Sequence, residues 1–235
     1  MAVLLGRTSP SSTAISVHIR VCEEKNLIIA VEGIDGAGKN TLVTAVTNQL
    51  RSQGHSVSSM TFPAYRQTIF ADFADQALHG QLGDTADSAW AMALLFALDR
   101  KDRRQAIIDA TRENDVLIID RYVASNAAYS LARTQDPAIV EWIEKTEFGD
   151  FQLPLPDVQV CLATSVGVAA DRARKREATD VQRTRDVYEK DSSLQERTLA
   201  TYQKFAEDSW QSPWLMLTGD DGADRLVEWI SARLR

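Results

Sequence analysis

Five short apolar runs alternate with longer segments of helical periodicity, and this alternation is the strongest constraint on the fold. The runs read as strands and lie at residues 27–32, 55–62, 116–120, 158–163 and 214–217. Strands that alternate with helices predict a parallel sheet with right-handed crossovers. The expected fold class is therefore α/β, a doubly wound five-stranded parallel sheet with helices on both faces.

The intervening segments carry apolar residues at helical spacing, and no Pro, Gly or Ser-rich linker divides the chain. A length of 235 residues is enough for one α/β domain with a sizeable core. We expect a flexible N-terminal extension over residues 1–26 and one domain over 27–235. The predicted helices cover residues 39–50, 67–79, 87–112, 123–132 and 137–148, a charged pair from 166 to 210, and a last helix from 223.

The segment GIDGAGKNT follows the first strand and has the form of a phosphate-binding loop. Gly33, Gly36 and Gly38 allow backbone conformations with positive φ, so successive N–H groups can turn around a polyphosphate. Lys39 adds a mobile charge, and the helix that begins there adds its partial positive charge. A plain glycine-rich turn is the alternative, but the flanking strand and helix favour a phosphate site. The residues expected to bind the polyphosphate are Gly33, Asp35, Gly36, Ala37, Gly38, Lys39, Asn40 and Thr41.

Two positions bear on a metal ion. The residue after the loop lysine is usually Ser or Thr, whose hydroxyl ligates Mg²⁺. This chain has Asn40 there, with Thr41 one step further on. Asp120 ends the third strand and is similar to the carboxylate that holds Mg²⁺ near such loops, directly or through water. A capping or core-edge aspartate would have the same sequence signature.

The charge distribution is uneven. The chain has 26 basic and 33 acidic residues, a formal charge of −7, which argues against general nucleic-acid binding. Between residues 172 and 185, six basic residues stand against two acidic ones. A mobile arginine-rich lid over the phosphates fits this excess, although a solvated helix face is the alternative. The basic residues are Arg172, Arg174, Lys175, Arg176, Arg183 and Arg185.

Cysteine usage and apolar run lengths indicate a compartment. Cys22 and Cys161 have no metal-binding spacing and form no disulfide framework, so a reducing cytoplasm is the simplest location. The longest apolar run, residues 89–98, has ten residues and is too short to cross a membrane. We expect no membrane association and interpret this run as a core or subunit-interface helix.

Five motifs in consistent order resemble bacterial thymidylate kinase, especially its actinobacterial form. They are GIDGAGK, FPAY, FALDR, DRYVASNAAY and RDVYEKD, and the resemblance covers residues 27–217. It implies a P-loop nucleoside monophosphate kinase fold with an arginine-rich lid. It also implies transfer of the ATP γ-phosphate to dTMP, giving ADP and dTDP for dTTP biosynthesis, with Mg²⁺ and a homodimeric enzyme. A buried core helix would account for residues 89–98 without a dimer.

The resemblance assigns roles on the acceptor side. Phe96 would stack on thymine, and Arg100 and Asn126 would hydrogen-bond the base. Tyr129 would crowd the 2′ position of the sugar and favour deoxyribose. From the residues alone, a helix-surface ion pair of Arg100 with Asp99 or Asp102 is the default interpretation. The full acceptor set is Phe62, Tyr65, Phe96, Arg100, Arg121, Asn126 and Tyr129.

Further roles follow from the resemblance. Arg121 and Tyr65 would hold the acceptor phosphate, and Asp35 would lie near the 3′-hydroxyl. Glu189 would approach the metal or nucleotide, so Mg²⁺ is expected at Asp35, Asp120 and Glu189 together with phosphate oxygens and water. Ala64 and Arg66 depart from the usual arginine and small residue around the tyrosine of FPAY. The expected catalytic set is Lys39, Asp35, Arg121 and the lid arginines Arg172, Arg176 and Arg183.

The acceptor chemistry is consistent with this set. A phosphate monoester has a second pKa of about 6, so its oxygen is largely deprotonated at neutral pH and needs no general base. The barrier lies in bringing two anions together, which calls for cations. The alternatives are a kinase for another nucleoside monophosphate and, from another class, a nucleotide-dependent regulatory ATPase. The second leaves Phe96, Arg100 and Asn126 without a role.

Overall fold

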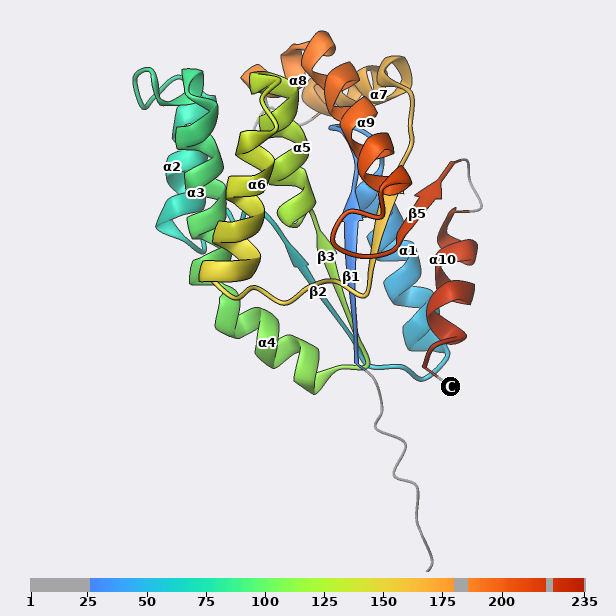
Figure 1. The fold of residues 1–235 in the computed structure, drawn as a ribbon. Coiled ribbons are helices and arrows are strands. Elements are labelled where there is room, and N and C mark those ends of the chain that lie inside the picture. The colour runs from blue at the N-terminus through green and yellow to red at the C-terminus, as the bar shows by residue number, and fades with distance from the viewer. Residues whose placement is uncertain (1–25, 180–185, 219–221, 235) are drawn as a thin grey trace, which may run out of the picture.

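A computed structural model of the chain describes residues 26–179, 186–218 and 222–234 (Figure 1). The described strands form one parallel sheet in the order β2-β3-β1-β4-β5, which confirms the expected fold class. Because the strands are parallel, their carboxyl ends meet at one edge, where ligands bind in doubly wound folds. The strands are β1 (Leu27–Glu32), β2 (Val57–Thr61), β3 (Val116–Asp120), β4 (Val158–Leu162) and β5 (Trp214–Leu217).

Strand β1 lies at the centre of the sheet, and all six of its residues are buried. Its alternate side chains enter two different cores, as the two-residue period of a strand requires. Leu27, Ile29 and Val31 pack with the helices on one face, and Ile28 and Ala30 pack with those on the other. The near-continuous apolar character of β1 is thus explained by burial on both faces.

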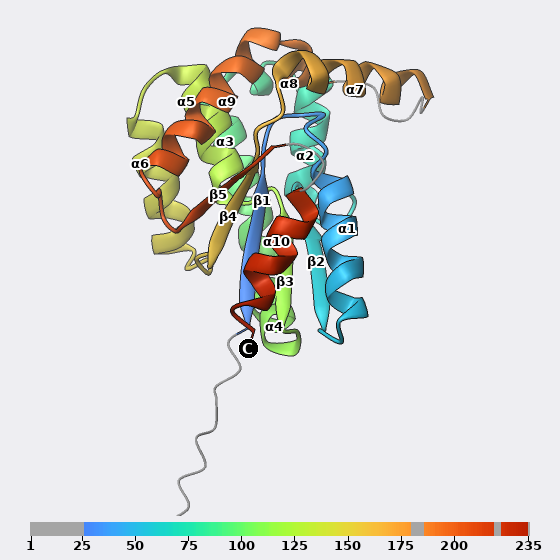
Figure 2. The ribbon, with the colours of Figure 1, turned by 90° about the vertical axis from the view of Figure 1, so that its right-hand side faces the viewer.

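Helices cover both faces (Figures 1 and 2). The first core contains residues of α1 and α10, and the second contains residues of α3, α4, α5, α6 and α9. The described helices are α1 (Lys39–Ser52), α2 (Ile69–Leu78), α3 (Ala89–Asp102), α4 (Arg104–Glu113), α5 (Val123–Thr134), α6 (Ala138–Glu144), α7 (Val166–Thr179), α8 (Val187–Lys190), α9 (Ser192–Glu207) and α10 (Gly222–Ser231), with the 3₁₀ turn η1 (Thr85–Asp87) and the π-helical segment η2 (Lys145–Asp150).

Three segments that were predicted as continuous helices or as a helix pair are interrupted in the structure. The segment 87–112 divides into α3 and α4 at Arg103, whose backbone (φ −91°, ψ 3°) leaves the helical region. The segment 137–148 changes at residue 145 from α6 to η2. The charged pair is three helices, because Asp186 and Asp191 each cap a new N-terminus by accepting backbone N–H groups. Periodicity alone does not register such local interruptions.

The predicted N-terminal extension lies outside the described residues except for Asn26. The expected lid at 172–185 begins on α7, and its residues 180–185 also lie outside them. In the part of the chain that the structure describes, no helix is long and apolar enough to span a membrane.

Candidate active site

All seven residues of the expected acceptor set line one cavity at the carboxyl edge of the sheet. The cavity is bounded by the segment after β2, by α3, and by the turn from β3 into α5. Asp35 from the loop after β1 also lines it, so the acceptor cavity and the glycine-rich loop are contiguous. The residues brought together are Phe62, Tyr65, Phe96, Arg100, Arg121, Asn126 and Tyr129.

The glycine-rich loop has the backbone that the sequence predicted. Gly33, Gly36 and Gly38 have φ values of 140°, 76° and 104°, which L side chains rarely adopt. At Gly36 a Cβ would also lie 2.2 Å from the carbonyl oxygen of Ala169, so no other residue fits there. Helix α1 begins at Lys39, as expected, with its N-terminus at the loop.

Lys39 is buried inside this loop. Its Nζ donates to the carbonyl oxygens of Gly33 (3.1 Å) and Ile34 (3.0 Å). Burial, with the nearby charge of Arg121, lowers the pKa of Lys39 to about 8. The side chain is thus a partly desolvated cation whose charge an incoming polyphosphate would stabilise.

A second cavity lies on the other side of the loop. Ala37, Gly38 and Thr41 line it, and Arg172 reaches it from α7. The carbonyl oxygen of Ala37 accepts hydrogen bonds from Arg172 Nη1 (3.2 Å) and Thr164 Oγ1 (3.0 Å). The loop residues of this cavity were predicted, but its walls from the ends of β4 and β5 and the start of α10 were not. The side chain of Arg176 and all of Arg183 lie outside the described part.

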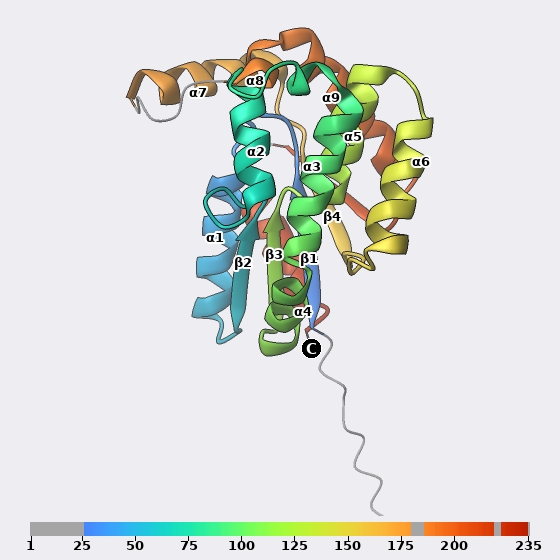
Figure 3. The same cartoon turned by 90° about the vertical axis from the view of Figure 1, so that its left-hand side faces the viewer.

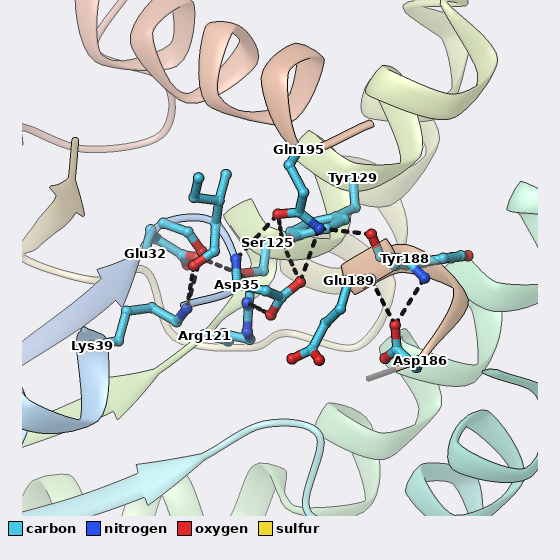
Figure 4. A network of polar contacts seen from close by, with 12 residues as sticks. Glu32, Asp35, Lys39, Arg121, Ser125, Tyr129, Asp186, Tyr188, Glu189 and Gln195 are labelled. Carbon is cyan, nitrogen blue, oxygen red and sulfur yellow. Dashed lines mark hydrogen bonds and ion pairs between the residues drawn. The ribbon is translucent and has the colours of Figure 1, made fainter. Parts of the chain in front are cut away.

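Asp35 is the centre of a polar network (Figure 4). It forms an ion pair with Arg121, accepts a hydrogen bond from Tyr129 Oη (2.8 Å), and contacts Gln195 through both its side chain (3.2 Å) and its backbone N–H (3.1 Å). Burial works to raise the pKa of Asp35, but the charges of Arg121 and Lys39 outweigh it and lower that pKa to about 2. Asp35 is therefore an anion that fixes the position of Arg121.

Two further residues of this network were missed. Gln195 on α9 connects Asp35, Tyr129 and the backbone of Tyr188. Glu32, fully buried at the end of β1, accepts from the backbone N–H of Tyr122 (2.9 Å) and from the hydroxyls of Ser125 and Tyr202. A charged residue at the end of an apolar strand was a visible signal for Glu32. Nothing in the sequence distinguished Gln195 from other polar residues on α9.

The base side of the cavity contains a buried ion pair. Arg100 donates through Nε (2.5 Å) and Nη2 (2.8 Å) to the carboxylate of Glu147. Arg100 is 2% exposed, so the alternative of a surface ion pair with Asp99 or Asp102 was wrong. Asp99 instead accepts from the backbone N–H of Ala64 (2.9 Å) and the hydroxyl of Thr68. Glu147 was missed because it lies 47 residues from Arg100 in a segment without a motif.

The expected metal ligands differ in whether their oxygens already have hydrogen-bond partners. Asp120 Oδ1 is buried and has no hydrogen-bond partner among the described residues. A buried carboxylate oxygen of this kind fits a ligand of a metal ion or of a metal-bound water. The oxygens of Asp35 are occupied by Arg121, Tyr129 and Gln195. Glu189 lies on α8 beside Asp186, and Asn40 and Thr41 are exposed at the start of α1. In the described part of the chain, no three acidic, His or Cys side chains form a metal-binding group by themselves.

Phe62, Pro63 and Tyr65 of the FPAY segment line the acceptor cavity, but the two neighbours of the tyrosine do not. Tyr65 lines the acceptor cavity, whereas Ala64 is buried and Arg66 is exposed. Arg66 has a left-handed backbone (φ 61°), and its N–H donates to Asp72. Neither Ala64 nor Arg66 lines the cavity, so this segment contributes no arginine to the acceptor site.

Comparisons with known proteins agree with this geometry. A family model described as thymidylate kinase matches residues 31–213. The thymidylate kinase of Mycobacterium tuberculosis is 47% identical over 204 residues, covering 86% of this chain and 95% of that protein. The thymidylate kinase of Akkermansia muciniphila is 30% identical and covers 91% of each chain. The family model and these relatives agree with the motifs in the sequence, and the chain belongs to the thymidylate kinase family.

Proposed function

We propose that this chain transfers the γ-phosphate of ATP to dTMP, giving ADP and dTDP. Membership of the thymidylate kinase family supports the reaction, and the cavity that adjoins the glycine-rich loop is the observation that supports its location at these residues. dTMP occupies the acceptor cavity, with its base near Phe96 and its phosphate near Arg121. The polyphosphate of ATP lies on the loop that Lys39 closes.

The reaction requires positive charge to bring two anions together, and it does not require a general base to deprotonate the acceptor. An oxygen of the dTMP phosphate attacks the γ-phosphorus of ATP, and the bond to the bridging oxygen breaks as ADP leaves. Lys39 and Arg172 lie on the loop side and Arg121 on the acceptor side, so they reduce the repulsion between the two anions. Arg176 and Arg183 are proposed to join them from the lid.

Asp35 acts as a positioning residue for the acceptor phosphate. Its ion pair holds Arg121 at the cavity wall, where a planar guanidinium can grip two phosphate oxygens. Tyr129 donates to the same carboxylate and lines the same cavity, which fits contact with the sugar. The network thereby couples recognition of the sugar to placement of the phosphate-binding arginine.

The second cavity is proposed to hold the rest of ATP. Its walls come from the loop, from Thr164 after β4 and from Gly222 at the start of α10. Mg²⁺ is proposed to bind at Asp120 with phosphate oxygens and water, and with Glu189 and Asp35 nearby. Oδ1 of Asp120 has no hydrogen-bond partner in the described part of the chain, which supports this assignment. When bound, the ion would neutralise charge on the donor phosphates.

A substrate panel tests the function. Purified protein is assayed with ATP against dTMP, dUMP, UMP, CMP, AMP and GMP, with and without Mg²⁺. We expect dTMP to have the highest kcat/KM and chelation of Mg²⁺ to abolish turnover. A preference for a ribonucleotide would favour the other nucleoside monophosphate kinases. Slow ATP hydrolysis without phosphate acceptance would identify a regulatory ATPase.

A homodimer is proposed from an exposed apolar patch on α2 and α3, which contact each other at the surface (Figure 3). Ile69, Phe73, Trp90 and Leu94 are 59%, 36%, 43% and 42% exposed, and each helix contributes an i,i+4 pair. Such a surface is typical of a subunit interface. The predicted run 89–98 thus belongs both to the core and to this patch.

The dimer prediction is that Leu94→Glu converts the protein to a monomer in sedimentation velocity, because burying a carboxylate in the interface is unfavourable. Leu155→Glu is the control, since Leu155 is 51% exposed in the loop between η2 and β4 and is not one of the four patch residues. A wild-type protein that sediments as a monomer at micromolar concentration would exclude the proposal.

A cytoplasmic location is also proposed. The buried Cys161 is a free thiol, and burial raises its pKa to about 12, so it is an inert core residue suited to a reducing compartment. Cell fractionation with an antibody to the protein tests this, and recovery in a membrane or secreted fraction would contradict it.

A further inference from the structure

Glu147 connects the two side chains that the base is proposed to meet. It lies in the π-helical segment η2 and is 0% exposed. Its carboxylate accepts from Arg100 Nε (2.5 Å), from Arg100 Nη2 (2.8 Å) and from Asn126 Nδ2 (2.8 Å). π-Helical turns are uncommon and often occur at functional sites. Glu147 does not line the acceptor cavity, so any effect on a ligand passes through its partners.

The partners of Asn126 determine which way its amide faces. Nδ2 donates to Glu147 and to the carbonyl oxygen of Ala93 (3.0 Å). A carboxylate and a carbonyl only accept, so the NH₂ group must lie on their side. The remaining polar atom is Oδ1, which among the described residues accepts one long hydrogen bond, from Ser130 Oγ (3.4 Å). Asn126 therefore presents an acceptor toward the cavity that it lines.

Arg100 is oriented by the same carboxylate. With Nε and Nη2 directed at Glu147, Nη1 is the nitrogen for which the described residues supply no hydrogen-bond partner. Arg100 lines the cavity too, so this nitrogen offers a donor there. The base site thus presents a donor from Arg100 beside an acceptor from Asn126, and one buried carboxylate fixes both.

We propose that Glu147 is a positioning residue that selects thymine over cytosine by fixing this donor–acceptor order. The inference rests on the proposed binding of dTMP in the acceptor cavity. Thymine presents an acceptor (O4) beside a donor (N3–H), which complements Arg100 and Asn126. Cytosine presents an amino donor beside an acceptor (N3), so it places donor against donor and acceptor against acceptor. A site that leaves such groups unpaired rejects the ligand strongly.

The test is Glu147→Gln, which keeps the shape of the side chain and replaces one acceptor oxygen by a donor. The new amide nitrogen opposes Arg100 Nε if it replaces Oε2, and it opposes both Arg100 Nη2 and Asn126 Nδ2 if it replaces Oε1. At least one of the three contacts thus becomes donor against donor, so Asn126 turns its amide or Arg100 leaves its position. Dissociation constants of dTMP, dUMP and dCMP are measured by calorimetry. We expect the preference for dTMP over dCMP to fall about tenfold or more. The preference for dTMP over dUMP should change less than about threefold, because uracil has the same hydrogen-bonding edge as thymine.

Two further variants keep the test decisive. Glu147→Asp retains the charge opposite Arg100 but is one methylene shorter, and it replaces the glutamine variant if that protein does not fold. Leu50→Ala, in the core around α1, is a destabilised control that should leave both preferences unchanged. If dTMP and dCMP weaken equally in the Glu147 variants, the inference is wrong although dTMP remains the substrate. If the wild type does not bind dTMP, the proposed function itself fails.

Discussion

Lys39→Ala is expected to lower kcat for dTMP phosphorylation by about 100- to 1,000-fold, the usual effect of removing one preorganised charge-stabilising group. Lys39 lies in the glycine-rich loop and does not line the acceptor cavity, so the dissociation constant of dTMP should change less than about threefold. Steady-state kinetics and calorimetric binding of dTMP measure the two effects. A variant that loses only dTMP affinity would contradict the placement of Lys39 on the donor side.

The Lys39→Ala variant is expected to fold. Burial disfavours the charged form of Lys39, as its lowered pKa shows, and alanine removes this desolvation cost. Lys204→Ala is the matched control, since Lys204 is exposed on α9 and pairs with Asp208. Its kcat should remain at the wild-type value.

The pKa of Lys39 gives an independent signature of its contact with ATP. In the free enzyme this pKa is about 8, and a bound polyphosphate should raise it. Above the free pKa, ATP binding therefore takes up a proton, and ATP affinity falls as the pH rises. Calorimetry at about pH 8.5 in buffers of different ionisation enthalpy detects the uptake. Lys39→Arg should bind ATP without it, because arginine stays protonated; unchanged uptake in that variant would assign the proton to another group.

The sequence was informative where function imposes local patterns. The strand, glycines and lysine of residues 27–39 define their own conformation, so β1, the loop and the start of α1 were predicted at their observed bounds. The acceptor set was found because its members belong to recognisable motifs. Its location in one cavity then follows from the parallel sheet, which gathers strand ends at one edge.

The site residues that the sequence did not reveal are those that orient other site residues. Glu147 and Gln195 contact predicted residues from 47 and 160 positions away, and neither lies in a charged or apolar pattern that a single sequence reveals. Their roles depend on where η2 and α9 pack against α3, α5 and the loop. The breaks at Arg103 and Lys145 were missed for the same reason, because the apolar period continues across a local change in backbone.

Arg121→Ala is expected to weaken dTMP binding by about 100-fold or more, because two charge-assisted hydrogen bonds to the phosphate are lost. Thymidine has no phosphate, so its affinity should change less than about threefold. Arg121 lines the cavity and is held in place by its ion pair with Asp35. A loss of affinity for dTMP but not for thymidine is expected if Arg121 binds the phosphate. Calorimetry with both ligands measures the effect. Arg112→Ala on α4, at the opposite end of the sheet, is the control (Figure 1).

The comparison of dTMP with thymidine also distinguishes phosphate binding by Arg121 from a structural role in holding Asp35. Removing Arg121 takes the ion-pair partner away from the partly buried Asp35, which is destabilising and would disturb Tyr129 as well. Arg121→Lys retains the charge but not the planar pair of donors, so it should restore stability while recovering only part of the dTMP affinity. If dTMP and thymidine weaken to the same extent in both variants, Arg121 serves to hold Asp35 in place, and the acceptor phosphate must be bound by other cations.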